Sequence, residues 1–153
     1  MIYILISIAV IALDQATKMM IREIPFDAEY RIIGDFLRIV HVENSGAAFG
    51  MFQGSTKLLL VLPAVIIAAS VFVLLKYPGK GRSGVVEKLA LCLIVSGGIG
   101  NIIDRLMFGH VTDMISFSIF PPVFNVADIA VTTGCGLLML SLLMGDRKSG
   151  ENR

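Results

Sequence analysis

Four acids stand out in this sequence because each lies inside or beside a long hydrophobic segment: Asp14, Asp104, Asp113 and Asp128. An acid at the centre of a membrane-spanning helix costs about 2.5–3.5 kcal/mol on insertion scales, so such residues usually serve a function. Two adjacent carboxylates can hydrolyse an amide with a water between them, because they repel each other and share one proton. Asp113 and Asp128 flank residues 114–127, and a bend there could bring them together. They form a candidate catalytic pair, and the alternative is a helix cap with an interfacial acid.

Other kinds of catalytic site are disfavoured by the residues that are present. There is no suitably placed Ser-His pair and no glycine-rich phosphate loop. Two histidines, His41 and His110, are too few for a histidine-built metal site. Cys92 and Cys135 lie in apolar runs, where cysteine packs as a small apolar residue. We expect neither a metal nor an organic cofactor.

The elements that must position these acids are membrane-spanning helices. Hydrophobic residues make up 56% of the 153 residues and charged residues only 16%, against about 25% in an ordinary soluble domain. A spanning helix needs about 20 mostly apolar residues. Four segments qualify, at about 2–21, 58–75, 89–107 and 126–144. The predicted fold class is an all-α membrane protein, with one integral membrane domain over residues 1–153.

The basic residues predict how the four helices are oriented. They gather between the second and third segments and in the tail: Lys76, Lys80, Arg82, Lys88, Arg147, Lys148 and Arg153. Because bases favour the cytoplasmic side, both termini are expected in the cytoplasm and residues 22–57 outside. The first segment lacks a basic leader and a cleavage site, so it is predicted to be a retained helix. The net charge of +1 gives no field that would attract nucleic acid.

The outer connection, residues 22–57, is predicted to form a small extracytoplasmic β-rich region. Residues 29–33 and 36–43 are rich in β-branched and aromatic residues, and a glycine between them suggests a hairpin. Residues 45–54 are mostly apolar and contain glycines, so they are expected either to lie on the membrane surface or to act as a mobile flap, a candidate lid. The connection before the fourth segment is expected to be a loop stiffened by Pro121 and Pro122.

The depths of the acids agree with one another. At about 1.5 Å per residue, all four are predicted to lie near the outer interface. The spacing within each helix also predicts local groups: the ion pair of Asp14 with Lys18, one polar stripe of Asn101, Asp104 and Arg105, and the i, i+3 pair of Asn125 and Asp128. The glycines at 97, 98 and 100 should let a neighbouring helix approach closely.

Two other functions remain open at this point. A small proton-coupled transporter or channel subunit could use Asp14 and Asp128 as carriers, although such proteins more often keep their acids near the midplane. A non-enzymatic assembly subunit could use the polar stripes to hold helices together. A protease needs a pocket open to the outer face and to lipid, whereas a transporter needs access from both faces.

Five short motifs resemble those of the lipoprotein signal peptidases (signal peptidase II), which are bacterial integral membrane aspartic proteases. They occur in the family's order, on four spans, at residues 13–18 (LDQATK), 44–50 (NSGAAFG), 100–105 (GNIIDR), 111–115 (VTDMI) and 124–128 (FNVAD). Each motif is weak alone, but the ordered set covers essentially the whole chain. Met114 stands where an aromatic residue is more often expected, a change in local packing.

The resemblance implies a function and a set of site residues. The catalytic pair would be Asp113 and Asp128. The supporting or substrate-binding residues would be Asp14, Lys18, Asn44, Gly46, Asn101, Asp104, Arg105 and Asn125. The substrate would be a diacylglyceryl-modified prolipoprotein, cut just before the lipidated cysteine. The enzyme would act as a monomer in the cytoplasmic (inner) membrane, in contact with membrane lipid, with its active site at the outer leaflet and without a cofactor or metal.

Overall fold

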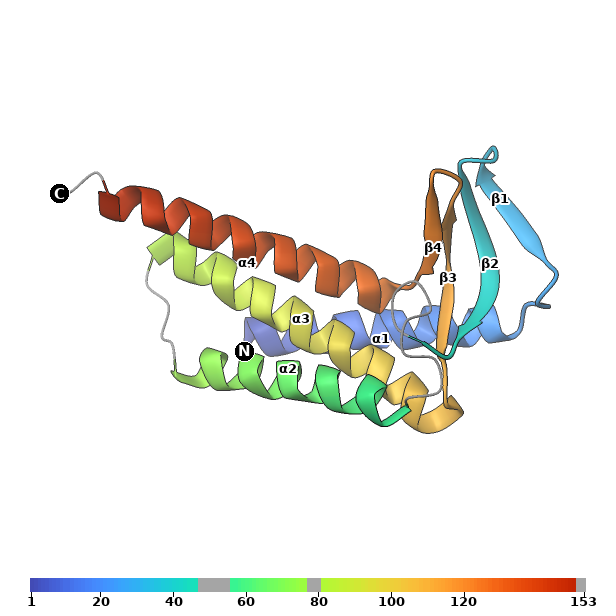
Figure 1. Ribbon diagram of the computed structural model, residues 1–153, viewed down its shortest axis with the longest axis horizontal. Coiled ribbons are helices and arrows are strands. Elements are labelled where there is room, and N and C mark those ends of the chain that lie inside the picture. Colours follow the sequence, from blue (N-terminus) through green and yellow to red (C-terminus); the bar gives the residue numbers. More distant parts are fainter. Residues whose placement is uncertain (47–55, 77–80, 151–153) are drawn as a thin grey trace.

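The computed structural model describes residues 1–46, 56–76 and 81–150 of the chain. The helices are α1 (Ile2–Arg22), α2 (Thr56–Lys76), α3 (Gly81–Phe108) and α4 (Val126–Gly150). The strands are β1 (Glu29–Ile33), β2 (Leu37–Asn44), β3 (Val111–Phe117) and β4 (Phe120–Phe124). The helices form an elongated bundle, and the strands cross the helix axes at one end of it (Figure 1). The candidate lid falls mostly on residues 47–55, outside the described residues.

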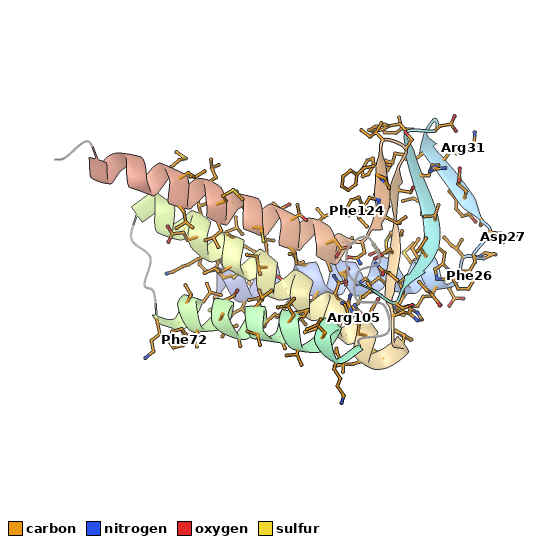
Figure 2. All side chains as sticks on the ribbon, viewed as in Figure 1. Phe26, Asp27, Arg31, Phe72, Arg105 and Phe124 are labelled. Atoms are coloured by element: carbon orange, nitrogen blue, oxygen red, sulfur yellow. The ribbon has the colours of Figure 1, made fainter. Side chains whose placement is uncertain are left out.

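The four helices coincide with the four predicted apolar segments. Within the described residues, each is long and apolar enough to cross a membrane. Many of their large apolar side chains are left uncovered, such as Val65 and Phe72 of α2 and Leu142 of α4 (Figure 2). Such a surface suits lipid rather than water. The chain is therefore a multi-pass membrane protein.

Helix α3 lies at the centre of the bundle and packs against the other three helices. Glycines allow this close packing, as the sequence predicted. A Cβ atom at Gly100 would lie 2.5 Å from Oδ2 of Asp14 on α1, and one at Gly134 would lie 2.6 Å from the Ala90 carbonyl oxygen. A larger residue at Gly134 would push α3 and α4 apart, and one at Gly100 would displace the Asp14 carboxylate. Helix α3 begins at Gly81, before the predicted segment at 89–107. The prediction missed these first turns because they are more polar, so the apolar run marks the spanning part rather than the whole helix.

The strands form one antiparallel sheet in the order β1-β2-β3-β4. The predicted hairpin of residues 29–33 and 36–43 is confirmed, with the second strand spanning Leu37–Asn44. The prediction of a plain loop before the fourth helix is wrong, because residues 111–124 form the hairpin of β3 and β4. The two prolines that suggested a loop lie on β4, an edge strand, where a missing N–H need not break a ladder.

The observed class is therefore four apolar helices with a four-stranded antiparallel sheet, and the term all-α omits the sheet. Strand β3 begins shortly after α3 ends, and Asn125 is the single residue between β4 and α4. This short path fixes the sheet against the ends of α3 and α4. The acids that the sequence singled out all lie at this junction.

Candidate functional site

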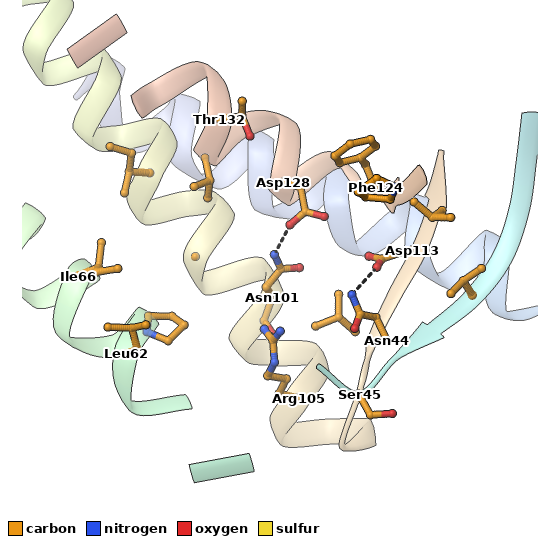
Figure 3. Close-up of a pocket in the computed structure, with 18 of the residues that line it drawn as sticks. Asn44, Ser45, Leu62, Ile66, Asn101, Arg105, Asp113, Phe124, Asp128 and Thr132 are labelled. Atoms are coloured by element: carbon orange, nitrogen blue, oxygen red, sulfur yellow. Dashed lines mark hydrogen bonds between the residues drawn. The ribbon is translucent and has the colours of Figure 1, made fainter. Parts of the chain in front are cut away.

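A pocket of about 560 Å³ lies between the sheet and helices α2, α3 and α4. The carboxylates of Asp113 and Asp128 both border it, the first reaching from β3 and the second from α4 (Figure 3). The opposite side is apolar and includes Leu62 and Ile66 of α2. The pocket thus combines a small polar end with an apolar wall inside the helix bundle.

Asp113 lies in the middle of β3, where its residue is only 2% exposed. Its Oδ2 accepts a hydrogen bond of 3.0 Å from Nδ2 of Asn44, and its Oδ1 accepts one of 2.6 Å from Nδ2 of Asn125. Burial raises the pKa of Asp113 from 3.8 to about 6, and the charge of nearby Asp128 adds to this rise. The hydrogen bonds from Asn44 and Asn125 oppose the rise in pKa without cancelling it.

Asp128 lies in the first turn of α4 and takes part in the cap of that helix. The Asn125 side chain accepts the Asp128 N–H at 2.8 Å, and the Asp128 carboxylate accepts the Asn125 N–H at 3.2 Å. This reciprocal arrangement is a capping box with aspartate in the usual place of glutamate. The other carboxylate oxygen accepts a 2.8 Å hydrogen bond from Nδ2 of Asn101 on α3. Both oxygens of Asp128 are therefore held in place.

Two asparagines connect the aspartate pair, Asp113 and Asp128. Asn125 donates to Asp113 and, at 3.1 Å, to Oδ1 of Asn101, and Asn101 in turn donates to Asp128. Oδ1 of Asn101 also accepts a 2.9 Å hydrogen bond from Nζ of Lys18. Because two donors meet at that oxygen, the Asn101 amide can only turn its NH₂ group toward Asp128.

The two remaining acids pair with cations behind the pocket. Lys18 lies 2.9 Å from Asp14 and 3.5 Å from Asp104, and Arg22 lies 2.8 Å from Asp104. The side chains of Lys18, Asp14 and Asp104 are fully buried. The predicted Asp14–Lys18 ion pair is thus confirmed, and it belongs to a larger group. We call Asp14, Lys18, Arg22 and Asp104 the cation cluster.

The cation cluster also accepts hydrogen bonds from the backbone next to each member of the aspartate pair. Oδ1 of Asp14 accepts the N–H of Ala127 at 2.9 Å, one residue before Asp128. Oδ2 of Asp104 accepts the N–H of Thr112 at 2.9 Å, one residue before the other aspartate. The cluster therefore ties α1 and α3 to the two segments that carry the pair. The predicted convergence of the four acids is confirmed by these contacts.

Arg105 lies apart from Asp104, although the sequence placed both in one polar stripe. Its guanidinium donates to the carbonyl oxygens of Gly46, at 3.0 Å, and Asn101, at 3.4 Å, and it borders the pocket. Gly46 donates its N–H to Oδ1 of Asn44 at 2.9 Å, which leaves the Asn44 amide nitrogen for Asp113. Consecutive residues on a helix point about 100° apart, so these neighbours serve different sides of α3.

Two residues of this junction were not predicted. Arg22 donates to Thr112 Oγ1 at 3.0 Å and lies 3.9 Å from the centre of the Phe108 ring, in addition to its ion pair. Gln15 donates to Asp104 at 3.2 Å and to the Gly100 carbonyl oxygen at 3.1 Å. The sequence signal for Arg22 was its position four residues after Lys18. Within the described residues, no group of three or more His, Cys, Asp or Glu side chains could hold a metal ion.

Comparisons with known proteins agree on one family. A family model described as Signal peptidase (SPase) II matches residues 6–144. The chain is 41% identical to the lipoprotein signal peptidase of Halothermothrix orenii over 143 residues, which are 93% of this chain and 94% of that protein. It is 34% identical to the lipoprotein signal peptidase of Brevibacillus brevis over 149 residues, 96% and 98% of the two chains.

Solved structures show the same relationship in three dimensions. Two structures described as bacterial membrane enzymes match with TM-scores of 0.85 and 0.82, each at 32% identity. The first match covers 93% of this chain and 87% of that chain, and the second covers 92% of both. Sequence and structure lead to the same conclusion: this chain belongs to the signal peptidase II family of membrane aspartic peptidases.

Proposed function

We propose that this protein removes the signal peptide from diacylglyceryl-modified prolipoproteins, cutting just before the lipidated cysteine. The observation that carries the proposal is the aspartate pair, two carboxylates without a contacting cation among the described residues that border one pocket. Membership of the signal peptidase II family supports this reaction. It does not support the transporter alternative.

In the proposed mechanism, Asp113 and Asp128 bind one water between them and share one proton. The ionised carboxylate removes a proton from the water as it attacks the scissile carbonyl carbon. The protonated carboxyl donates a hydrogen bond to the carbonyl oxygen and later protonates the leaving amine. The raised pKa of Asp113 supports this assignment, because a carboxyl that keeps its proton near pH 6 can act as an acid. The proton belongs to the pair rather than to one residue.

The predicted supporting residues fall into two groups with different tasks. Asn44, Asn101 and Asn125 hold the carboxylates through the hydrogen bonds described above. Asp14, Lys18 and Asp104 hold these asparagines and the neighbouring backbone in place. Arg105 borders the pocket, where it is placed to contact the substrate backbone, and it holds Gly46 beside it through a hydrogen bond to the Gly46 carbonyl oxygen. None of these residues is needed as an acid or a base in the reaction.

The shape of the pocket suits a substrate that lies partly in lipid. Its polar end is at the sheet, and its apolar wall continues between the spanning helices α2 and α4 through Ile66 and Val131. We place this end at the outer leaflet and both termini in the cytoplasm, because the bases of residues 76–88 and 147–153 belong to the other end and outnumber the acids there. The sheet is then extracytoplasmic, and one copy of the chain supplies every residue of the mechanism.

The proposal is tested by comparing two synthetic substrates in one assay. Both carry the same signal sequence, and only one carries diacylglycerol on the cysteine. Purified protein in micelles or vesicles should cleave the lipidated substrate on the amino side of that cysteine and leave the other largely intact. Mass spectrometry identifies the cut. Equal cleavage of the two substrates would contradict the specificity, and no cleavage of either would contradict the reaction.

A further inference from the structure

One face of the sheet carries four phenylalanine rings in an unbroken row. The ring centre of Phe117 lies 5.6 Å from that of Phe36 and 6.5 Å from that of Phe124, and Phe124 lies 5.5 Å from Phe120. We call Phe36, Phe117, Phe120 and Phe124 the aromatic strip. It starts beside Asp128 at the pocket (Figure 3) and runs toward the turns of both hairpins.

At the outer end of the sheet, the opposite face carries polar and charged side chains. Arg38 pairs in register with Ser116, which precedes Phe117, so both point away from the aromatic strip. Arg38 bonds Ser116 at 3.4 Å and Glu29 at 3.2 Å. Arg31 lies in register with Arg38 and reaches Asp35 at 2.9 Å in the turn. The part of the sheet beyond the bundle is therefore amphipathic.

The aromatic strip faces the side on which the helices lie. Asp113 and Phe117 are four residues apart on β3 and thus point to the same face. Asp113 and Phe124 border the pocket against α4, so this face is turned toward the helices. The strands cross the helix axes, and the turns of both hairpins project past α4 (Figure 1). Since the helices cross the membrane, the projecting part of this face looks onto the lipid beside α4.

Protein atoms cover this projecting part only incompletely. Phe36 and Phe120 are 44% and 45% exposed, and Ile33 at the end of β1 and Ile119 in the β3–β4 turn are more exposed still. The apolar surface also continues from the membrane-spanning part, because Ile129 in the first turns of α4 is exposed as well. A surface that is aromatic toward the membrane and charged on its other face is typical of a segment lying in the lipid interface.

We propose that the aromatic strip rests on the membrane and anchors the sheet in the lipid interface beside α4. Lipid acyl chains and headgroup carbons cover Phe36 and Phe120, while Arg31 and Arg38 remain in water. The anchor fixes the height of β3, and therefore of Asp113, relative to the bilayer. It adds a membrane contact outside the four spanning helices. It depends on the membrane crossing and not on the peptidase reaction.

The absence of tryptophan from the chain makes this contact directly measurable. Phe120→Trp and Phe36→Trp each introduce one tryptophan into the strip, on different hairpins, and Arg31→Trp is the matched control on the charged face. Each full-length variant is reconstituted in phosphatidylcholine–phosphatidylglycerol vesicles with or without brominated acyl chains, which quench tryptophan on contact. Interfacial segments bury about 5–10 Å into the headgroup and acyl boundary. The strip variants should therefore lose about half of their emission or more, and Arg31→Trp much less.

Because there are two strip variants, the test can still be read if one of them fails to fold. The quenching and the emission wavelength can both be measured without enzymatic activity. Emission from the strip variants should also shift to shorter wavelength than emission from Arg31→Trp. Quenching at positions 36 and 120 that does not exceed quenching at position 31 would overturn the proposal. That result would also be obtained if a second copy of the chain covered the strip, because its protein atoms would exclude lipid. Cleavage of the lipidated substrate in the same vesicles reports on the proposed function separately.

Discussion

Two groups of acids lie side by side at the sheet end of the bundle, and they are stabilised in different ways. In the cation cluster, Asp14 and Asp104 share Lys18, and Arg22 completes the charge balance. Two negative and two positive charges neutralise one another, and only Arg22 is partly exposed to solvent. A buried ion pair of this kind is hard to break, because removal of one partner leaves an uncompensated charge.

In the aspartate pair, neutral amides take the place of cations. Asp113 accepts from Asn44 and Asn125, and Asp128 accepts from Asn101 and a backbone N–H. Among the described residues, no ion pair reaches either carboxylate. Amides orient a carboxylate without fixing its charge, so the pair can still exchange a proton. The difference supports the proposal that the aspartate pair performs the chemistry and the cation cluster builds the site.

The largest effect is expected when the aspartate pair is neutralised. Asp113→Asn and Asp128→Asn should each lower kcat/KM on a lipidated substrate by about 10³-fold or more, since each removes an acid–base group. The folded protein should survive, because asparagine keeps the size of the side chain. Cleavage rates and thermal unfolding in micelles measure the two quantities. Full activity in either variant would show that the pair does not act as assigned.

Disruption of the cation cluster should instead affect the free energy of unfolding. Asp104→Ala leaves Lys18 and Arg22 with one carboxylate between them and frees the Thr112 N–H, so a loss of about 3 kcal/mol is expected. Thermal unfolding checks this, with Asp104→Asn as the milder companion. Activity per folded molecule should fall less than in the two variants above. An Asp104→Ala protein of normal stability but no activity would reverse the assignment of the two groups.

Two matched amide deletions compare the groups more finely. Asn101→Ala removes the hydrogen bond to Asp128, and a bond to a charged group is worth about 1.5–3 kcal/mol, so kcat should fall about 30-fold. Gln15→Ala removes an amide of the same kind that donates to Asp104 of the cation cluster. It should change kcat only a few-fold while it lowers the melting temperature. Equal effects of the two variants on kcat would remove the distinction.

The smallest predicted effect is the pH dependence of the aspartate pair. The pKa of Asp113 is raised to about 6, so acidification through that value returns the shared proton and a rise in pH removes it. Between about pH 6 and 7, kcat/KM should fall about fivefold as the pair becomes doubly ionised. A profile of kcat/KM against pH checks this. A plateau that extends far above pH 6 would contradict the shared proton.

The raised pKa of Asp113 also makes the stability of the folded protein depend on pH. The folded state binds the Asp113 proton more tightly than the unfolded chain does, because the folded pKa exceeds 3.8. The stabilisation from this proton is complete below about 3.8 and is lost as pH rises through about 6. Asp113→Asn should lack this part of the pH dependence of the melting temperature.

Much of the fold could be predicted because lipid imposes simple rules. Four long apolar runs must be helices, and their directions place the four acids at one end. The hairpin of β1 and β2 followed from its β-branched residues. The hairpin of β3 and β4 was missed because Pro121 and Pro122 are typical of loops, and their tolerance on an edge strand depends on the sheet around them. Local sequence carries no information about such a neighbour.

Partners within the site were harder to predict than positions. Spacing paired Asp14 with Lys18 correctly, because both lie on one face of one helix. It grouped Asp104 with Arg105, but the tertiary structure turns the first toward α1 and the second toward Gly46. Arg22 was passed over because a base at the end of an apolar helix is usually solvated. Its role depends on contacts with residues distant in sequence, such as Thr112 on β3.

The position of Asp128 in the first turn of α4 has a consequence for biogenesis. A chain made from its N-terminus inserts α1, α2 and α3 before α4, and β3 emerges only after α3. Asp14, Lys18 and Asn101 therefore precede both members of the aspartate pair in the order of synthesis. A chain interrupted at any stage before α4 packs against α3 lacks a second carboxylate. In the proposed mechanism, hydrolytic capacity therefore arises only when α4 packs against α3, in the final step of assembly.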